Sequence, residues 1–213
     1  MDKMKIKSAV LGMAATNCYF AINKETKETI IIDPAASGER LIRYLTTEAL
    51  KPVAILLTHG HVDHILAVGD LKERFGIPVY AHEAEKAVLT STRYNLSTMF
   101  GTSVKMDADV YLKDGQKIEL AGFEITVLHT PGHTPGGCCY YIPSEKVLFS
   151  GDTLFHYSIG RTDFPGGSMS QLVRAIKEKL FVLPEDTNVL PGHESSTQIG
   201  FEKKNNPFCG GSI

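Results

Sequence analysis

The sequence predicts an α+β fold in which two β-sheets pack together and helices cover their outer sides. Short apolar, β-branched runs bounded by turn residues occur in two blocks of the chain, and each block also contains stretches with helical periodicity. No low-complexity linker separates the blocks. We therefore expect residues 1–213 to form one domain.

The first block begins with strands expected at Cys18–Ile22 and Glu28–Pro34, where a β-branched run ends at a proline. Ser37 is a candidate N-cap for a helix from about Gly38 to Ala49, which places its leucines on one face. Val53–Thr58 is a second fully apolar strand. The remaining elements expected in this block are a helix opened by Asp63 and running from about His64 to Phe75, a strand at Ile77–Ala81, a helix at His82–Leu89 and an irregular segment at Ser91–Met106.

The second block is rich in strands separated by turns that contain glycine or aspartate. The expected elements are strands at Val110–Leu112, Lys117–Leu120, Phe123–His129, Gly137–Ile142, Lys146–Ser150 and Thr187–Pro191, with a helix at Ser170–Leu180. Two strand-rich blocks that each carry helices indicate two sheets packed together with helices outside.

Composition excludes several classes of function. A formal net charge of −2 argues against a general nucleic-acid binder. The N-terminus lacks the apolar core of a signal peptide, and no run approaches the roughly 18 apolar residues that span a bilayer. We therefore expect a cytoplasmic protein that binds neither membranes nor nucleic acid, with its oligomeric state left open. The 4 cysteines form no CxxC pair, which argues against a disulfide framework or a thiolate zinc site.

Histidine and aspartate side chains follow the ends of several expected strands, often beside a glycine. Rigid strand ends can aim metal ligands accurately, and glycines allow the chain to turn sharply there. Imidazole and carboxylate groups suit zinc, iron or manganese. Seven candidates are too many for one tetrahedral ion, whereas two ions that share a bridging carboxylate would use them all. The candidates are His59, His61, Asp63, His64, His133, Asp152 and His193.

The segments THGHVDHI, HTPGHTPG, SGDTLF and LPGHE resemble motifs of the metallo-β-lactamase superfamily. The resemblance covers nearly the whole chain, from about Cys18 to Phe208, and implies a four-layer αββα sandwich. Together with TNCY, IIDPA, IGRTDFPGG and the closing NPF, these segments are most similar to short bacterial proteins of the glyoxalase II (hydroxyacylglutathione hydrolase) type.

The resemblance also implies a role for each candidate residue. The first metal would be held by His59, His61 and His133, and the second by Asp63, His64 and His193. Asp152 would bridge both ions, and the carboxylates Asp63 and Asp152 would be the catalytic pair. Asp33 would orient a ligand histidine. The implied cofactors are two divalent metal ions, with zinc expected and iron or manganese as alternatives.

The implied reaction is hydrolysis of a thioester, in which a metal-bound hydroxide attacks the carbonyl of S-lactoylglutathione or a related acyl-thiol. An aspartate stands where some β-lactamases of the superfamily have a cysteine, which argues against antibiotic hydrolysis. The alternatives are another small ester or lactone hydrolase and a persulfide dioxygenase. The dioxygenase would use one iron held by His59, His133 and Asp152.

Two further residues are candidates for binding the substrate. Arg161 could hold a substrate carboxylate, or it could form a surface ion pair with Asp163 instead. His156 follows Phe155 in a loop and is a candidate for lining the pocket. The sequence leaves the acyl group and the thiol open.

Overall fold

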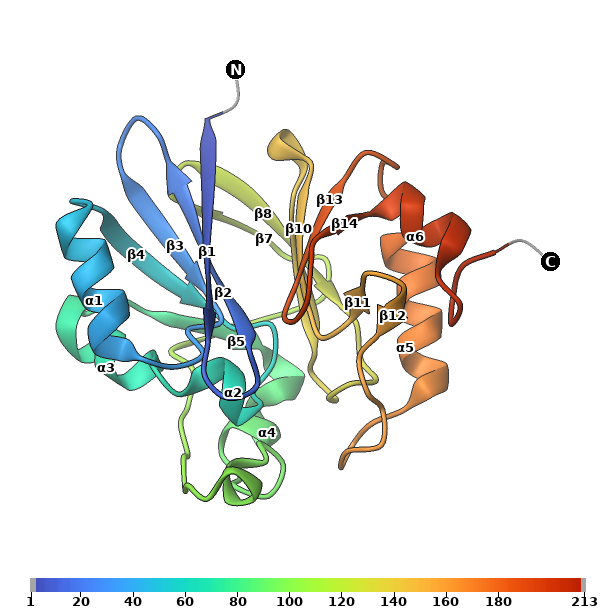
Figure 1. Ribbon diagram of the computed structural model, residues 1–213, viewed down its shortest axis with the longest axis horizontal. Helices are drawn as coiled ribbons and strands as arrows, with labels where there is room; N and C mark the ends of the chain where they lie inside the picture. The colour runs from blue at the N-terminus through green and yellow to red at the C-terminus, as the bar shows by residue number, and fades with distance from the viewer. Residues whose placement is uncertain (1–2, 212–213) are drawn as a thin grey trace.

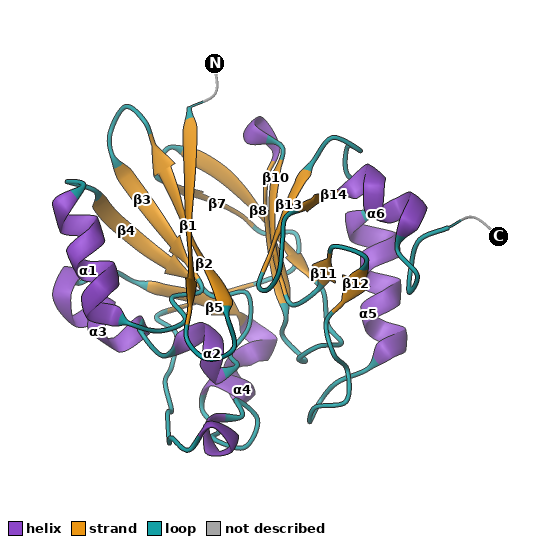
Figure 2. Cartoon of the chain, in the orientation of Figure 1, coloured by secondary structure: helices purple, strands orange, loops and turns teal. Residues whose placement is uncertain are grey.

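The fold has four layers, in which two six-stranded sheets pack against each other between outer layers of helices (Figures 1 and 2). The computed structural model describes residues 3–211. This arrangement confirms the αββα sandwich predicted from the sequence. Among the described residues, no helix combines the length and apolar character needed to cross a membrane.

The N-terminal sheet is mixed: its first three strands are antiparallel and the others run parallel. In spatial order it consists of β1 (Met4–Leu11), β2 (Thr16–Asn23), β3 (Glu28–Ile32), β4 (Lys51–Leu56), β5 (Val79–His82) and β6 (Val110–Leu112). The C-terminal sheet consists of β14 (Thr197–Gln198), β13 (Asn188–Pro191), β10 (Val147–Gly151), β9 (Cys138–Ile142), β8 (Phe123–His129) and β7 (Lys117–Leu120). A small hairpin pairs β11 (Leu154–Phe155) with β12 (Ser158–Ile159).

The helices are short, and most of them cover the outer faces of the sheets (Figure 2). The α-helices are α1 (Gly38–Thr47), α2 (Val62–Ile65), α3 (Val68–Phe75), α4 (Lys86–Leu89), α5 (Met169–Ala175) and α6 (Ile199–Asn205). The other helical turns are η1 (Glu83–Glu85), η2 (Ser97–Phe100), η3 (Pro143–Glu145) and the π-helical turn η4 (Ile176–Leu180).

The position of strand β3 between two cores explains the continuous apolar run Ile30–Ile32. Ile30 and Ile32 belong to the core between the two sheets, whereas Ile31 points the other way, into the core under α1 and α3. Side chains alternate along a strand, so a strand buried on both faces needs a continuous apolar run. Each of these buried side chains contributes about 1.5–3 kcal/mol to stability.

Several strands end at one edge of the sandwich, and this edge carries the candidate ligands. β4 runs parallel to β3 in one sheet and β10 runs parallel to β13 in the other, so the carboxyl ends of each pair lie together. The backbone N–H of Asn17, at the start of β2, donates to Gly192 just past the end of β13 and joins the two sheets there. Loops that leave these strand ends are therefore held on rigid supports.

The structure corrects several sequence predictions. The helix expected from about His64 to Phe75 is broken, because the N–H of Ala67 donates to the carbonyl of Pro34 instead of continuing α2. Ser37 does not cap α1 with its side chain; its φ is 59°, and its carbonyl accepts the first bonds of the helix. Asp63 lies inside α2, behind the N-cap His61. The helix predicted at Ser170–Leu180 is α5, continued by a π-helical turn.

Other elements were not predicted or differ in type. The segment predicted as a helix from His82 begins with the last residue of β5, followed by the short turns η1 and α4. The strands β1, β11, β12 and β14 and the helix α6 have no counterpart among the predictions. The first half of β1, Met4–Lys7, alternates apolar with charged residues, as expected for an edge strand with one exposed face.

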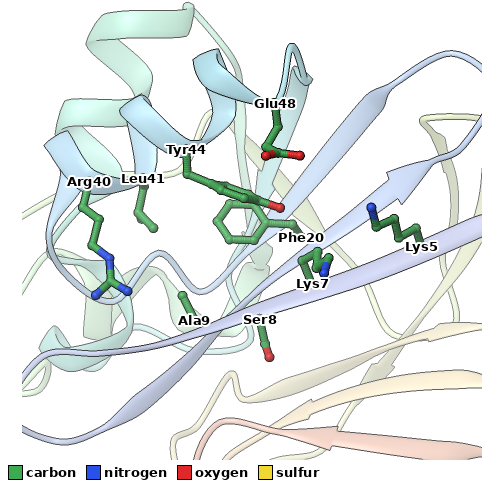
Figure 3. Close-up of a pocket in the computed structure, with 9 residues that line it drawn as sticks. All are labelled: Lys5, Lys7, Ser8, Ala9, Phe20, Arg40, Leu41, Tyr44 and Glu48. Atoms are coloured by element: carbon green, nitrogen blue, oxygen red, sulfur yellow. The ribbon is translucent and has the colours of Figure 1, made fainter.

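A cavity of about 290 Å³ lies between α1 and the strands β1 and β2 (Figure 3). Phe20, Leu41 and Tyr44 contribute apolar surface, and the rings of Phe20 and Tyr44 lie 5.0 Å apart. Lys7 and Arg40 supply cations at the same cavity. None of its lining residues is a candidate metal ligand, so this cavity is separate from the centre described next.

Candidate metal centre

The structure brings all seven candidate ligands together at the edge where the strands end. His59 and His61 follow β4, and the short helix α2 supplies Asp63 and His64. The other three come from distant segments: His133 from the loop after β8, Asp152 from the end of β10 and His193 from the end of β13. Four of the five histidines are almost completely buried. The strands thus place groups from four separate segments around one centre.

Three imidazoles form a first group. His59 Nε2 lies 3.1 Å from His61 Nδ1, and His133 Nε2 lies 2.9 Å from the same nitrogen. The three ligand atoms lie within 4.8 Å of one another. Neutral nitrogen atoms at this spacing repel unless a proton or a cation lies between them. This group is suited to one metal ion with three imidazole ligands.

A second group lies beside the first and contains a carboxylate. Asp63 Oδ2 lies 3.6 Å from His64 Nε2 and 3.4 Å from His193 Nε2. Asp152 contacts both groups: its Oδ2 lies 3.4 Å from His133 Nε2 and 3.4 Å from His193 Nε2, and its Oδ1 lies 3.4 Å from His64 Nε2. One carboxylate between two groups of ligands is the arrangement of a bridged dinuclear site.

Hydrogen bonds to Nδ1 leave the inward-facing Nε2 of three histidines available to bind metal. His133 Nδ1 is 2.7 Å from the carbonyl of Arg161, and His193 Nδ1 is 3.1 Å from that of Ala14. A carbonyl only accepts, so both Nδ1 atoms carry a proton, and the Nε2 atoms that point inward are the ones available to a metal ion. His64 Nδ1 likewise donates to Asp33. This fixed tautomer is typical of metal-ligating histidines.

Thr58 and Asp33 support the centre from behind. Thr58 Oγ1 donates to Asp33 Oδ2 at 2.6 Å and lies 3.2 Å from His59 Nδ1, while Asp33 Oδ2 also accepts from His64 Nδ1 at 3.0 Å. Asp33 has a φ of 49°, an uncommon backbone conformation for a non-glycine residue. This single carboxylate orients a histidine of the second group directly and one of the first group through Thr58. The role of Thr58 was not predicted, although it stands next to His59 in the motif.

The donor set fits two divalent cations. The buried atoms His61 Nε2, His64 Nε2 and Asp152 Oδ1 have no hydrogen-bond partner. A buried polar atom without a partner costs stability, and a cation contacting His64 and Asp152 would satisfy two of these three. Five imidazoles and two carboxylates match the preferences of zinc, iron and manganese alike. The cluster therefore indicates divalent metals without selecting one.

The two groups of ligands titrate in opposite directions. Burial and the neighbouring histidines lower the pKa of His61 to about 3, so its imidazole is neutral. Burial opposes the protonation of His64 and His193, but the carboxylates of Asp63 and Asp152 outweigh it and raise their pKa values to about 9 and about 10. Those histidines in turn hold the pKa of Asp152 well below its usual range. Without metal, the imidazoles of His64 and His193 are therefore both protonated at neutral pH.

For the metal-free protein we expect the free energy of unfolding to fall as the pH rises from 6.5 to about 10. His64 and His193 bind their protons more tightly in the folded state, so their contribution is complete below the ordinary pKa of 6.5. It disappears as the pH passes the folded values of about 9 and about 10. We expect the loss to amount to several kcal/mol, because each unit of pKa difference between the folded and unfolded states is worth about 1.36 kcal/mol. Urea unfolding of chelator-treated protein measures it, and constant or rising stability over this range would contradict the assignment.

The glycines beside the ligands serve two different purposes. Gly151 has a φ of 48°, and Gly132 has a φ of 135°, so both adopt a backbone conformation that favours glycine, as predicted. Gly60 and Gly192 do not have a positive φ, and at both positions a Cβ would instead meet a neighbouring side chain. A Cβ at Gly192 would lie 2.3 Å from Asp152 Oδ1. Here glycine is required because the backbone closely approaches a ligand.

The two predicted substrate-binding residues lie outside the group of ligands. Arg161 is exposed and forms two hydrogen bonds with Asp163, and its guanidinium lies 4.4 Å from the ring centre of Phe164. Phe164 in turn lies 5.5 Å from the ring of His61, so this cation is one side chain away from the first group. His156 packs instead against Tyr157 and α6, with its ring 5.2 Å from that of Phe201.

Comparison with known proteins agrees with this geometry. The family model described as "Metallo-beta-lactamase superfamily" matches residues 11–193. The probable metallo-hydrolase YqgX of Bacillus subtilis is 39% identical, with 98% of this chain and 99% of the relative covered. The hydroxyacylglutathione hydrolase GloC of Haemophilus influenzae is 38% identical, with 90% and 92% covered.

Two solved structures are also similar over nearly their whole length. The BLEG-1 B3 metallo-β-lactamase has a TM-score of 0.93 at 43% identity, with 97% of this chain and 100% of the other covered. TTHA1623, solved in a di-iron-bound form, has a TM-score of 0.85 at 36% identity, with 95% and 99% covered. These similarities extend across both sheets and the centre between them.

Proposed function

Because the chain belongs to the metallo-β-lactamase superfamily and is a metal-dependent hydrolase, we propose that it cleaves thioesters in the manner of glyoxalase II. Its substrate would be S-lactoylglutathione or a related acyl-thiol. The similarity to a hydroxyacylglutathione hydrolase over 90% of this chain supports the substrate class. Zinc is the proposed metal, with iron as the principal alternative because a relative binds two iron ions.

The observation that carries the proposal is the position of Asp152 between the two groups of ligands. Its oxygens lie 3.4 Å from nitrogens of both groups, which supports a dinuclear hydrolase. A dioxygenase with a single iron would need His59, His133 and Asp152 and would leave the other four side chains without a function. The convergence of all seven on one centre favours the hydrolase.

Water is the nucleophile that the site favours. The four cysteines of the chain are buried, and none belongs to a group of candidate metal ligands. Burial raises the pKa of Cys139 to about 11, so this thiol is not a nucleophile at neutral pH. When bound, two divalent ions would lower the pKa of a coordinated water towards neutrality and polarise the substrate carbonyl.

The residues of the chain position the reacting groups. Asp63, whose pKa the neighbouring histidines hold well below its usual range despite burial, stays ionised at neutral pH and is available to hold a cation. The hydroxyl of Thr16 donates to Asp63 Oδ2 at 3.0 Å and orients it. A thiol leaves with a pKa of about 8.5, so its departure needs little acid assistance. Arg161 is the proposed contact for a substrate carboxylate, which would compete with Asp163.

Hydrolysis of β-lactams is the second candidate, because a structure at 43% identity is titled a B3 metallo-β-lactamase. The same ligand geometry can direct water at a lactam, an ester or a lactone. The thioester reaction has the advantage of its leaving group, because a thiolate is expelled more readily than an amide nitrogen. Direct competition between substrates decides between the candidates.

Metal analysis combined with a substrate panel tests the proposal. Protein loaded with zinc, iron(II) or manganese(II) is assayed with S-lactoylglutathione, a simple acyl thioester, a lactone and a β-lactam. We expect two metal ions per chain and a kcat/KM for thioesters about 100-fold above the other classes, a difference of about 2.7 kcal/mol in transition-state stabilisation.

Other outcomes would replace the proposal. Faster cleavage of the β-lactam would assign the antibiotic-hydrolysing activity. One iron per chain, with oxygen uptake in the presence of glutathione persulfide and no hydrolysis, would assign the dioxygenase. Unchanged hydrolysis after substitution of His59 in metal-replete protein would place the activity outside this centre.

A further inference from the structure

Glu85 is a buried carboxylate to which neither the sequence motifs nor the proposed reaction assigns a function. It ends the short helical turn η1, directly after β5, and only 1% of its surface is exposed. Burial raises its pKa to about 7 even though three hydrogen bonds oppose the shift. Burying a carboxylate is costly, so its place in the fold requires an explanation.

The two oxygens of Glu85 bind two different loops. Oε1 accepts from the backbone N–H of Gly60 at 2.7 Å. Oε2 accepts from the hydroxyl of Thr134 at 2.9 Å and from the backbone N–H of Gly136 at 2.8 Å. Gly60 lies between His59 and His61, and Thr134 follows His133. The carboxylate is therefore hydrogen-bonded to both loops that supply the first group of ligands.

Both loops also pack closely against the helical segment that carries Glu85, which leaves them little room to move relative to it. A Cβ at Gly136 would lie 2.2 Å from the backbone nitrogen of Glu85, and a Cβ at Gly60 would lie 2.9 Å from Leu89 Cδ2. The segment that carries Glu85 is thus seated directly against the backbone of both loops. Any displacement of the carboxylate would move His59 and His61 relative to His133.

We propose that Glu85 is a positioning residue for the first metal site, because its single carboxylate fixes the two loops that hold the three imidazoles at their mutual spacing. All three of its partners are donors, and a carboxylate offers an acceptor oxygen on each arm. His61 Nδ1 lies 3.1 Å from His59 Nε2 and 2.9 Å from His133 Nε2, a spacing that small loop movements would destroy. The inference rests on the metal centre of the proposed function but does not depend on the substrate.

Glu85→Gln tests the proposal, because it keeps the shape and replaces one acceptor with an NH2 group that cannot receive an N–H. The better arrangement leaves the amide oxygen on Thr134 and Gly136 and breaks the bond to Gly60. We expect the affinity of the first site to fall about 10–100-fold, as for other residues that orient ligands. Calorimetric titration of metal-free protein with zinc measures this without any substrate. In a background with both Asp63→Ala and His193→Ala, the second group keeps only His64 and the shared Asp152, so the isotherm reports the first site.

The chain offers a matched control in Glu202. This glutamate is also completely buried and also accepts from three donors, which are Tyr157 N, Thr197 Oγ1 and Asn206 Nδ2. None of its partners adjoins a metal ligand in the sequence. Glu202→Gln should lower stability in urea to a similar extent while leaving the affinity of both metal sites unchanged.

A second pair of variants covers the case in which Glu85→Gln fails to fold. Thr134→Val removes one donor to the carboxylate, and Thr134→Ser keeps it. We expect a several-fold weaker first site in the valine variant and recovery in the serine variant. Wild-type affinity at the first site in Glu85→Gln, or an equal loss in Glu202→Gln, would overturn the proposal and leave Glu85 with a purely structural role. Because zinc binding is the readout, a failure of the thioester assay would leave this result unaffected.

Discussion

Replacing Asp152 with asparagine is expected to lower kcat/KM for the thioester about 1000-fold or more. The amide has one oxygen and one NH2 group, so it cannot serve both groups of ligands, which lie 3.4 Å from the carboxylate oxygens. Losing the charge also removes an attraction of several kcal/mol for the ions, and each 1.36 kcal/mol corresponds to about a tenfold change in rate. Steady-state kinetics and metal analysis of the same sample measure both effects, and we expect less than two ions per chain.

Asp186→Asn is the matched control for that experiment. Asp186 is an exposed aspartate that pairs with Lys146 on the surface, where ion pairs contribute little. Its amide variant should retain full activity and full metal content. Activity within about tenfold of wild type in Asp152→Asn would mean that the carboxylate does not bridge two catalytic ions, since a bridging ligand is worth several kcal/mol.

Gly192→Ala is also expected to lower both the stability and the activity of the protein, although it adds a single methyl group. The new Cβ would lie 2.3 Å from Asp152 Oδ1 and 2.8 Å from His64 Cε1. These side chains cannot yield easily, because His64 is also held by Asp33 and Asp152 lies at a buried strand end. We expect overpacking to cost about 1–3 kcal/mol of stability. A fall in kcat/KM of about 100-fold should accompany it, because misplacing groups by about 1 Å has that effect.

Gly69→Ala is the same substitution at a position with free space, and it is expected to raise stability instead of lowering it. Gly69 lies in α3, and a Cβ there would have no atom within 4 Å. Alanine should raise the free energy of unfolding by about 0.5–1 kcal/mol through helix propensity, with no change in kinetics. Equal tolerance of alanine at positions 69 and 192, measured by urea unfolding and kcat/KM, would refute the packing argument.

The sequence was sufficient to predict the layered fold because its signals are local. A buried strand such as β3 needs apolar residues on both faces, and the run Ile30–Ile32 provides them whatever its neighbours are. The strand β1 was missed because only its first half alternates apolar with charged residues, and its second half, SAVL, does not. The helix predicted from about His64 failed because Ala67 bonds to Pro34, a partner 33 residues away that propensity cannot anticipate.

The sequence by itself determined which side chains are available as ligands, because imidazoles and carboxylates next to strand ends and glycines form a local pattern. Only the tertiary structure decided how these side chains are held. Three features arise from contacts between residues far apart in sequence. These are the position of Asp152 between the two groups of ligands, the requirement for glycine at position 192, and the hydrogen bonds from two loops to Glu85. Such contacts depend on the packing of two sheets to within a few tenths of an ångström. No short stretch of sequence contains that information.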